Sequence, residues 1–393
     1  EPDTLLFAGI NSRYCRGVIA LTNDDSTNLA VAIAARLLAP ALPALCRAEH
    51  AETVNNMASF GTRHIINPFE QFGEYMALAL HSPAAYHLLL WLTGLPGTTV
   101  TRHRDPPVGK WVLCGYGSFG KVMTEALENA SLPVTIIDRS PPADPAHHWI
   151  KGDGTGADAL AAAGIREAVG IVAATGNDVN NLSIVVTAHQ MNPGLFTVLR
   201  QNHVANRALF DAFESDFTMV PSEIVAHECL AILTTPLLAP FLAAVRKADD
   251  AWAEALLQDV TGRFGWDVPA VWSVAINISQ APSVYRLLMR HEARLKLGDL
   301  LRAPVTGRPE LACRALLLLR EGDPPRLLPD ADQEILLGDQ LLFVGDETAR
   351  KELGLTLFNA HTLNYVLTGL DSPGGLVWEW LAARRRAKDA AHG

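Results

Sequence analysis

The chain has 393 residues, which is more than one ordinary domain holds, so we expect two or three domains. Hydrophobic residues make up 49% and charged residues 19%, a composition typical of a globular protein and not of a disordered one. The net charge of −10 argues against nucleic acid as a main partner. The five cysteines are scattered and form no CxxC pair, which argues against a zinc site or disulfide framework and favours a reducing cytosol.

Residues 1–96 begin with alternating strand and helix patterns. The run "VIALT" from Val18 is short, apolar and β-branched, as in a buried parallel strand, and "STNLAVAIAARLL" from Ser26 has helical spacing. The runs "LPALCR", "ETVNNMASF" and "RHIIN" then predict a strand, a helix and a strand. This alternation predicts βαβ crossovers and a parallel sheet. Apolar helices follow Pro68 and break at Pro83, and we expect them to be buried at an interface.

The first part of the chain is repeated later in the sequence. Shifted by about 153 positions, residues 17–83 align without a gap with residues 170–236, and about 16 of 67 aligned positions are identical. The identical pairs include Thr22/Thr175, Asp25/Asp178, Asn28/Asn181, Arg47/Arg200, His50/His203 and Pro68/Pro221. Because chance identity is far lower, we interpret the two segments as copies of one duplicated unit.

The second copy is preceded by a glycine-rich loop that the first copy lacks. Residues 97–110 are polar and contain proline, which predicts a linker, and Trp111–Cys114 then predict a strand. Gly115, Gly117 and Gly120 follow as G-x-G-x-x-G and open a helix. The first glycine permits a tight turn, the second allows backbone to approach a pyrophosphate, and the third permits close helix–strand packing. The helix N-terminus offers N–H groups to phosphates.

The next predicted strand, "PVTIID", ends at Asp138, about 20 residues after the loop. An acidic residue at this position binds ribose hydroxyls in dinucleotide-binding folds. Asp138 favours NAD over NADP because a carboxylate repels a 2′-phosphate, although Arg139 beside it weakens that preference. The alternative, a glycine turn without a ligand, is less well supported because strand, loop, helix and acid occur in the expected order.

Three further sites are candidates for ligand contact, and two of them have a second interpretation. Asp153, in the turn "GDGTGA", is either a helix N-cap or a residue near the adenosine. The strand "IVAAT" ends at Thr175, followed by Gly176 and Asn177, at the sheet edge where ligands bind. Arg200 ends the strand "FTVLR"; its recurrence as Arg47 makes a shared structural role at least as plausible as ligand contact.

Other features carry less functional information. The longest apolar stretch, Ile224–Val245, contains charged and proline residues, which favours buried helices over a membrane span. His147 and His148 are adjacent and point apart on a strand, so we interpret them as a surface edge and not as a metal site. The basic end of the chain, Arg384 to Lys388, predicts a solvated helix end, with anionic lipid headgroups as an alternative partner.

At this point the sequence resembles a known family. The segments "VLCGYGSFGKVM", "VTIIDRS", "IKGDGTGADALAAAGI" and "GIVAATGNDVNNLSIVVTAHQMNP" resemble the RCK (regulator of K+ conductance) domain, also called the KTN or TrkA-type domain. The usual "GDAT" is "GDGT" here. The region 268–346, with "GDQLLFVG" near its end, resembles the small C-terminal RCK subdomain, and its short β-rich runs independently predict an α+β domain.

The resemblance implies an α/β fold with Rossmann-like doubly wound parallel sheets, one partial and one complete, plus a small α+β subdomain. We expect a partial first lobe with interface helices at 1–96, a linker at 97–110, a complete nucleotide-binding lobe at 111–260, the C-type subdomain at 261–350 and a helical tail at 351–393. Because the first copy has no glycine loop, we also expect the chain to be a fragment of a longer tandem protein.

The family implies a cytosolic ligand-sensing module that gates a potassium channel or K+ transporter, and not an enzyme. We expect NAD(H), with ATP, ADP or AMP as alternatives, a membrane channel or transporter subunit as partner, and self-association into dimers and a gating ring at the inner face of the membrane. The rival interpretation is an NAD-dependent oxidoreductase. The predicted cofactor-binding residues are Gly115, Tyr116, Gly117, Ser118, Phe119, Gly120, Asp138, Arg139, Gly152, Asp153, Gly154, Thr155, Ala174, Thr175, Gly176, Asn177 and Arg200. We expect no catalytic and no metal-binding residue.

Overall fold

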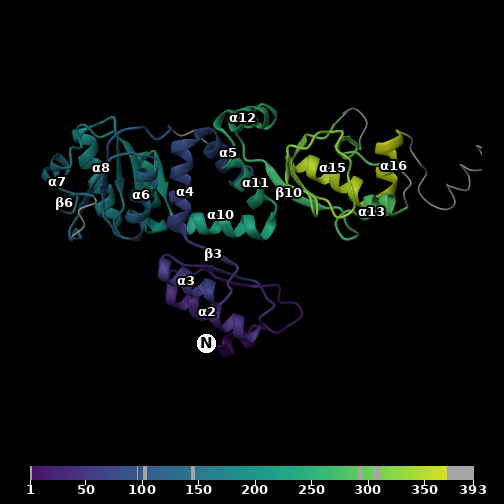
Figure 1. Cartoon of the computed structure of the whole chain (residues 1–393), viewed down its shortest axis with the longest axis horizontal. Coiled ribbons are helices and arrows are strands. Elements are labelled where there is room, and N and C mark those ends of the chain that lie inside the picture. The colour runs from purple at the N-terminus through teal and green to yellow at the C-terminus, as the bar shows by residue number, and fades with distance from the viewer. Residues whose placement is uncertain are drawn as a thin grey trace, which may run out of the picture. The chain divides into compact units, whose positions relative to one another are not determined.

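A computed structural model describes residues 2–94, 96–100, 104–142, 147–290, 294–304 and 310–369 (Figure 1). The chain divides into two compact units. The first unit holds two parallel sheets and comprises Glu1–Thr93, Thr101–Leu230 and Ala248–Leu257. The second unit holds an antiparallel sheet and comprises Gly94–Val100, Ala231–Lys247 and Gln258–Gly393.

The larger sheet of the first unit has six parallel strands in the order β6-β5-β4-β7-β8-β9. Numbered within this lobe, the order is 3-2-1-4-5-6, that of a doubly wound dinucleotide-binding fold. The predicted Rossmann-like lobe is therefore confirmed. Its elements are β4 (Trp111–Cys114), α6 (Ser118–Asn129), β5 (Val134–Asp138), β6 (His148–Lys151), α7 (Ala157–Ala162), β7 (Gly170–Ala173), α8 (Asp178–Met191), β8 (Phe196–Arg200), η1 (Val204–Asn206), α9 (Arg207–Phe213) and β9 (Phe217–Met219).

Both faces of this sheet are buried, which explains why its strands are apolar at nearly every position. On one face, Val112 and Ile171 pack with Leu160 of α7 and Ile184 of α8. On the other face lies a row of aromatic rings, and α6 covers part of it. The rings that contact one another there belong to Trp111, Phe196, Phe217, Phe72 and Phe119.

The smaller sheet of the first unit has three parallel strands in the order β1-β2-β3. Its elements are α1 (Pro2–Phe7), β1 (Val18–Ala20), α2 (Asp25–Leu38), β2 (Ala44–Arg47), α3 (Ala51–Ser59) and β3 (His64–Ile66). The strand registers of the two sheets coincide when the sequence is shifted by the repeat. The matching pairs are Val18–Ala44 with Ile171–Thr197, and Leu45–His64 with Val198–Phe217. The partial lobe is thus the counterpart of β7–β9.

The two copies also share their hydrogen bonds. The buried Asn28 accepts from the Thr22 backbone N–H at 3.0 Å and donates to the Arg47 carbonyl at 3.0 Å. The buried Asn181 makes the same two bonds, with Thr175 at 3.0 Å and with the Arg200 carbonyl at 2.7 Å. A buried carboxamide satisfied in this way fixes the strand-to-helix turn in both lobes.

Apolar helices follow each copy and break at the predicted prolines. They are α4 (Pro68–His81) with α5 (Pro83–Thr93), and α10 (Pro221–Thr234) with α11 (Leu238–Val245). At the first break, Asp250 accepts hydrogen bonds from the Ser82 hydroxyl at 2.7 Å and the Ala84 N–H at 3.1 Å. Asp250 begins α12 (Asp250–Phe264), so this helix secures the bend between α4 and α5.

Within the described ranges, no single helix is long and apolar enough to cross a bilayer. Together, α10 and α11 have that length and apolar composition, but they are bent by 117° at a short break.

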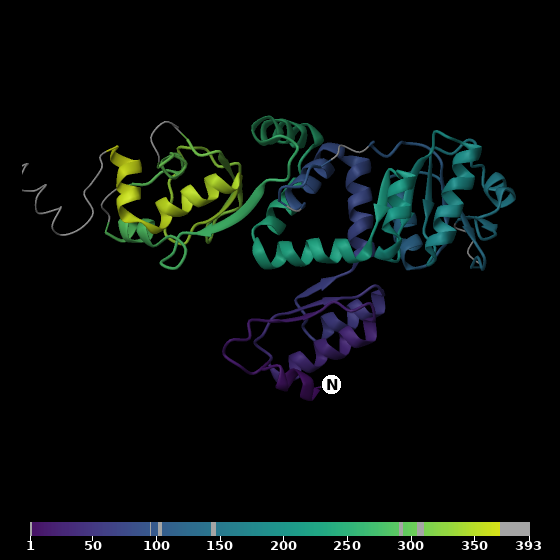
Figure 2. The same cartoon turned by 180° about the vertical axis from the view of Figure 1, so that it is seen from behind.

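The second unit is built on an antiparallel sheet in the order β10-β13-β11-β12, with α15 and α16 beside it (Figure 2). Its further elements are β10 (Ala270–Ala275), α13 (Pro282–Met289), α14 (Leu297–Leu300), β11 (Cys313–Leu319), β12 (Arg326–Leu327), β13 (Gln340–Gly345), α15 (Glu347–Phe358) and α16 (Ala360–Thr368). One hydrophobic core lies between the strands β10, β11 and β13 and the helices α13 to α16. The predicted small α+β subdomain is confirmed.

Two predicted segments join this unit in ways that the sequence did not indicate. Residues 97–100, assigned to the linker, pair with the chain near Asp267, where Thr99 forms an antiparallel bridge. Leu353, Leu357 and Leu363, assigned to the tail, are buried in the core of the antiparallel sheet. The basic segment Arg384–Lys388 lies outside the described residues. The boundaries 1–96, 97–110, 111–260, 261–350 and 351–393 stay a prediction.

Candidate functional site

The glycine loop joins β4 to α6, and each of its glycines has its own structural reason. Gly115 has φ = 99°, a left-handed conformation that favours glycine. A Cβ on Gly120 would lie 2.0 Å from the Gly115 carbonyl oxygen, so only glycine lets α6 begin this close to the strand. A Cβ on Gly117 would meet no atom within 4 Å, which leaves this backbone open to a ligand.

The N-terminus of α6 faces the same region. Gly117 is its N-cap residue, and no side chain in the described part of the chain caps the helix. The first N–H groups of a helix have no acceptor inside the helix and carry a partial positive charge. This end of α6 can therefore donate hydrogen bonds to a phosphate.

A pocket of about 440 Å³ opens at the carboxyl edge of the six-stranded sheet, beside this loop. We call it the Gly-loop pocket. Twelve of the seventeen predicted residues line it: Gly115, Tyr116, Gly117, Asp138, Arg139, Gly152, Asp153, Ala174, Thr175, Gly176, Asn177 and Arg200. Residues that are scattered over the sequence are thus brought together, because the carboxyl ends of parallel strands meet at one edge.

Five predicted residues do not line the Gly-loop pocket. Phe119 and Gly120 are buried beneath the loop, and Ser118 borders a different cavity. Gly154 has φ = 75° and packs against the end of β4, and the Thr155 hydroxyl donates a hydrogen bond to the Asp153 carboxylate. Two further residues, Ile137 and Asn180, line the pocket but were not predicted. Helical spacing after Asn177 points to Asn180, whereas strand alternation before Asp138 points away from Ile137.

Asp138 ties the glycine loop to the end of β5. One carboxylate oxygen accepts from the Tyr116 backbone N–H at 2.8 Å, and the other accepts from the Ser140 N–H at 2.8 Å. Each carboxylate oxygen can accept more than one hydrogen bond, so capacity remains for ribose hydroxyls. Asp138 therefore has a structural role and a position suited to the predicted binding role.

Asp153 sits in the turn after β6, across from Arg139. The Thr155 hydroxyl donates to its carboxylate at 2.8 Å and the Thr155 N–H donates at 3.1 Å. These bonds lower the pKa of Asp153 below its usual value, with a smaller contribution from the Arg139 guanidinium 3.7 Å away. Asp153 therefore holds its own turn and is not a helix N-cap, because Gly156 is the N-cap residue of α7.

Thr175 and Asn177 hold the turn before α8. The Thr175 hydroxyl donates to Asn181 at 2.6 Å, and Asn177 caps α8 by accepting from the Asn180 N–H at 3.0 Å. The first lobe, which has no glycine loop in this chain, has the same cap in Asp24. These side chains therefore have structural roles, and Thr175, Gly176 and Asn177 also line the Gly-loop pocket.

Arg200 ends β8 and lines the Gly-loop pocket. Its guanidinium carbon lies 4.6 Å from the ring centroid of Phe69 in α4, and its buried Nε has no hydrogen-bond partner among the described residues. Burial lowers the pKa of this guanidinium, Glu49 and Asp178 counteract the shift, and Arg47 adds to it. The group stays protonated at physiological pH because an arginine pKa is so high.

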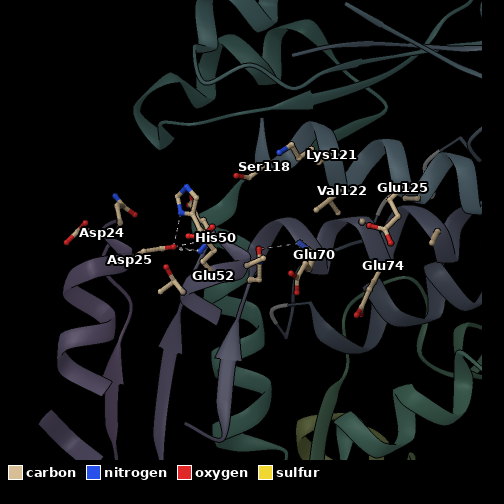
Figure 3. Close-up of a pocket in the computed structure, with 18 of the residues that line it drawn as sticks. Asp24, Asp25, His50, Glu52, Glu70, Glu74, Ser118, Lys121, Val122 and Glu125 are labelled. Carbon is tan, nitrogen blue, oxygen red and sulfur yellow. Dashed lines mark hydrogen bonds and ion pairs between the residues drawn. The ribbon is translucent and has the colours of Figure 1, made fainter. Parts of the chain in front are cut away.

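A larger cavity of about 1050 Å³ lies between the carboxyl edge of the three-stranded sheet, α4 and α6. Figure 3 shows carboxylates around it, from Asp24 and Asp25 at one end to Glu74 and Glu125 at the other. Lys121 is its lysine, and no arginine lines it. The described residues contain no group of three His, Cys, Asp or Glu side chains that could hold a metal ion.

Charge distinguishes the two cavities. The acidic cavity repels an anionic nucleotide, whereas the Gly-loop pocket combines a free helix N-terminus with two arginines. The smaller pocket is the better site for a phosphorylated ligand.

His147 and His148, which we did not assign to a metal, contact Glu128 at 3.1 Å and the Thr135 hydroxyl at 3.3 Å, respectively.

Comparison with protein families agrees with this geometry. Residues 1–68 and 111–221 match the TrkA-N domain model. The two matches end at Pro68 and Pro221, the prolines at which α4 and α10 begin and which correspond to each other in the repeat.

Curated relatives of this chain include proteins of potassium transport systems. Over 139 residues it is 27% identical to potassium channel protein 1 of Methanocaldococcus jannaschii, covering 34% of this chain and 42% of the relative. Over 136 residues it is 27% identical to a Trk system potassium uptake protein TrkA homolog of Pyrococcus horikoshii, covering 32% of this chain and 60% of the relative. The chain thus spans less than two thirds of the length of either protein.

Solved structures with a related arrangement were also found. The GsuK RCK domain has a TM-score of 0.48 and 15% identity, with 94% of this chain and 84% of that chain covered. The GsuK channel bound to NAD has a TM-score of 0.47 and 16% identity, with 91% and 69% covered.

Proposed function

We propose that this chain is the ligand-sensing regulatory part of a potassium channel or K+ transporter, and that NAD(H) or an adenine nucleotide binds in the Gly-loop pocket. The observation that carries the binding proposal is the agreement at one sheet edge of the glycine loop, the uncapped end of α6 and the carboxylate of Asp138. The potassium context comes from the relatives, which are a potassium channel protein and TrkA homologs.

Different pocket residues would bind different parts of the nucleotide. The backbone N–H groups at the start of α6 would hold the pyrophosphate, and the open space above Gly117 gives it room. Asp138 would accept from the ribose hydroxyls of the adenosine. That carboxylate disfavours a 2′-phosphate, so NAD(H), ADP and ATP fit better than NADP(H).

Regulation of the channel or transporter would need only a difference in nucleotide affinity between two arrangements of the chain. A nucleotide that binds one arrangement of the two parallel sheets more tightly shifts the population toward it. α4 packs on α6 within the first unit, so it is the element that would pass such a change on. In this proposal the chain acts at the inner face of the membrane, with a channel or transporter subunit as partner and with self-association into dimers and a gating ring.

The test is nucleotide binding with a paired set of glycine variants. We expect ADP and NADH to raise the melting temperature of the wild-type chain, and Gly117→Asp to abolish this shift because its carboxylate would take the place of the pyrophosphate. Gly156→Asp is the matched control, since Gly156 also faces open space but does not line the pocket. Equal stabilisation of all three proteins would place the ligand elsewhere.

A second experiment addresses the rival proposal of an NAD-dependent oxidoreductase. We expect NADH to bind without turnover, because a sensor needs only differential affinity. NADH formation from NAD and any member of a panel of alcohols and hydroxy acids would overturn the regulatory proposal.

A further inference from the structure

Arg47 and Arg200 are counterparts in the repeat, but their guanidinium groups have different surroundings. Arg47 is 6% exposed and bonds to Asn23 and Glu49. The positions that correspond to these partners are Gly176 and Asn202 in the second copy. Gly176 has no side chain to offer, and the Asn202 side chain is bonded to Asp178 and to the Thr175 carbonyl. The second copy thus lacks both partners that hold the first arginine.

Arg200 packs instead on an aromatic ring. Its guanidinium lies over Phe69, in the first turn of α4, and its Nε donor is buried without an acceptor among the described residues. A cation over a ring face is weakly held compared with a charge-assisted hydrogen bond to an anion. The same side chain lines the Gly-loop pocket. The Nε donor of Arg47 also lacks an acceptor, so Arg200 differs from its counterpart in its ring partner and in the absence of the two acceptors that Arg47 has.

Phe69 contacts both Arg200 and α6, the helix that follows the glycine loop. Its ring lies 5.8 Å from that of Phe119, the second residue of α6, so the start of α4 is packed between Arg200 and the loop helix. Phe69 is itself 2% exposed, which means that its position depends on both neighbours. A shift of Arg200 or of Phe119 would therefore alter the packing of the first turn of α4.

We propose that Arg200 is a ligand-sensing residue that exchanges the Phe69 ring for the anionic part of a nucleotide in the Gly-loop pocket, and thereby loosens the start of α4. This inference rests on the proposed function and names the residue through which that function acts. The phosphate would supply the acceptor that the Nε donor lacks. Because α4 follows directly on β3, the release connects ligand binding to the first lobe.

The test measures ADP and NADH affinity by calorimetry in four proteins. Phe69→Leu removes the competing ring, so we expect binding about two- to five-fold tighter than wild type. Arg200→Gln removes the cation, so we expect binding weaker by about tenfold or more. Phe72→Leu is the matched control, because Phe72 also contacts Phe119 from α4, whereas the ring under the Arg200 guanidinium is that of Phe69. Its affinity should equal that of the wild type.

Hydrogen exchange supplies a second readout that does not depend on affinity. In the wild type, ADP or NADH should speed amide exchange in the first two turns of α4, and Arg200→Gln should lose this response. Wild-type affinity in Phe69→Leu, or exchange in α4 that ligand leaves unchanged, would overturn the inference. If the wild type binds neither probe, the proposed function fails as well, so the two failures are distinguishable.

Discussion

The Tyr75 phenol donates a 2.8 Å hydrogen bond to the Glu228 carboxylate, and these two residues are counterparts in the repeat, 153 positions apart. Tyr75 belongs to α4 and Glu228 to α10. The helices that follow the two copies therefore contact each other through equivalent positions of the repeat.

Tyr75→Phe should destabilise the first unit by about 1 kcal/mol, because it removes a hydrogen bond to a charged acceptor. The measurement is the free energy of urea unfolding for the transition of that unit, with a double-mutant cycle that includes Glu228→Gln. We expect the two substitutions together to cost less than the sum of their separate costs. Strictly additive effects would show that the two side chains do not interact.

Much of the fold could be predicted because the chain contains its own template. An ungapped repeat implies that both copies have the same strand register, as the pairs Val18–Ala44 and Ile171–Thr197 have. The end of the chain had no such template. The pattern of α15 and α16 predicts helices but does not indicate whether Leu353 and Leu363 face solvent or a core, since tertiary packing decides this.

The site could be predicted to the extent that backbone forms it. The requirement for glycine at Gly115 and Gly120 follows from local geometry, and the acid at Asp138 from its place at a strand end. The packing of Arg200 on Phe69 could not be predicted, because it depends on how α4 leaves the first lobe and returns to the second. Sequence spacing carries no information on that path.

The carboxylates of Asp25 and Asp178 should make stability depend on pH. Burial by itself raises the pKa of Asp178, but hydrogen bonds from Asn202, together with those from neighbouring donors, outweigh burial and lower its pKa. The pKa of Asp25 is lowered in the same way. A carboxyl group whose pKa is lower in the folded state stabilises the fold above its unfolded pKa of about 3.9. This stabilisation is lost as the pH falls through the lower, folded value.

We therefore expect Asp178→Asn to reduce the free energy of unfolding at pH 7 and to matter progressively less as the pH falls toward 3. The variant Asp25→Asn should behave likewise in the first lobe. The measurement is urea unfolding of wild type and variants at a series of pH values. A difference between wild type and variant that stays constant over this range would contradict the assignment.

The second unit offers a contrast between a buried and an exposed ion pair. Asp339 is fully buried and accepts two hydrogen bonds from Arg320, at 2.8 and 2.9 Å, and one from the Leu336 N–H at 2.8 Å. Asp332 pairs with Lys296 at 2.7 Å, but its side chain is 88% exposed. Removing one partner of a buried pair leaves the other charge without compensation.

Asp339→Ala should thus destabilise the second unit by about 3–5 kcal/mol. It should also speed amide exchange along β11 and β13, because Arg320 follows the end of β11 and Asp339 precedes the start of β13, at the same end of the strand pair. Asp332→Ala is the matched control and should produce no measurable change, since water screens an exposed pair. Hydrogen exchange of both variants measures this directly, and equal protection of β11 in the two would show that Asp339 does not hold the sheet.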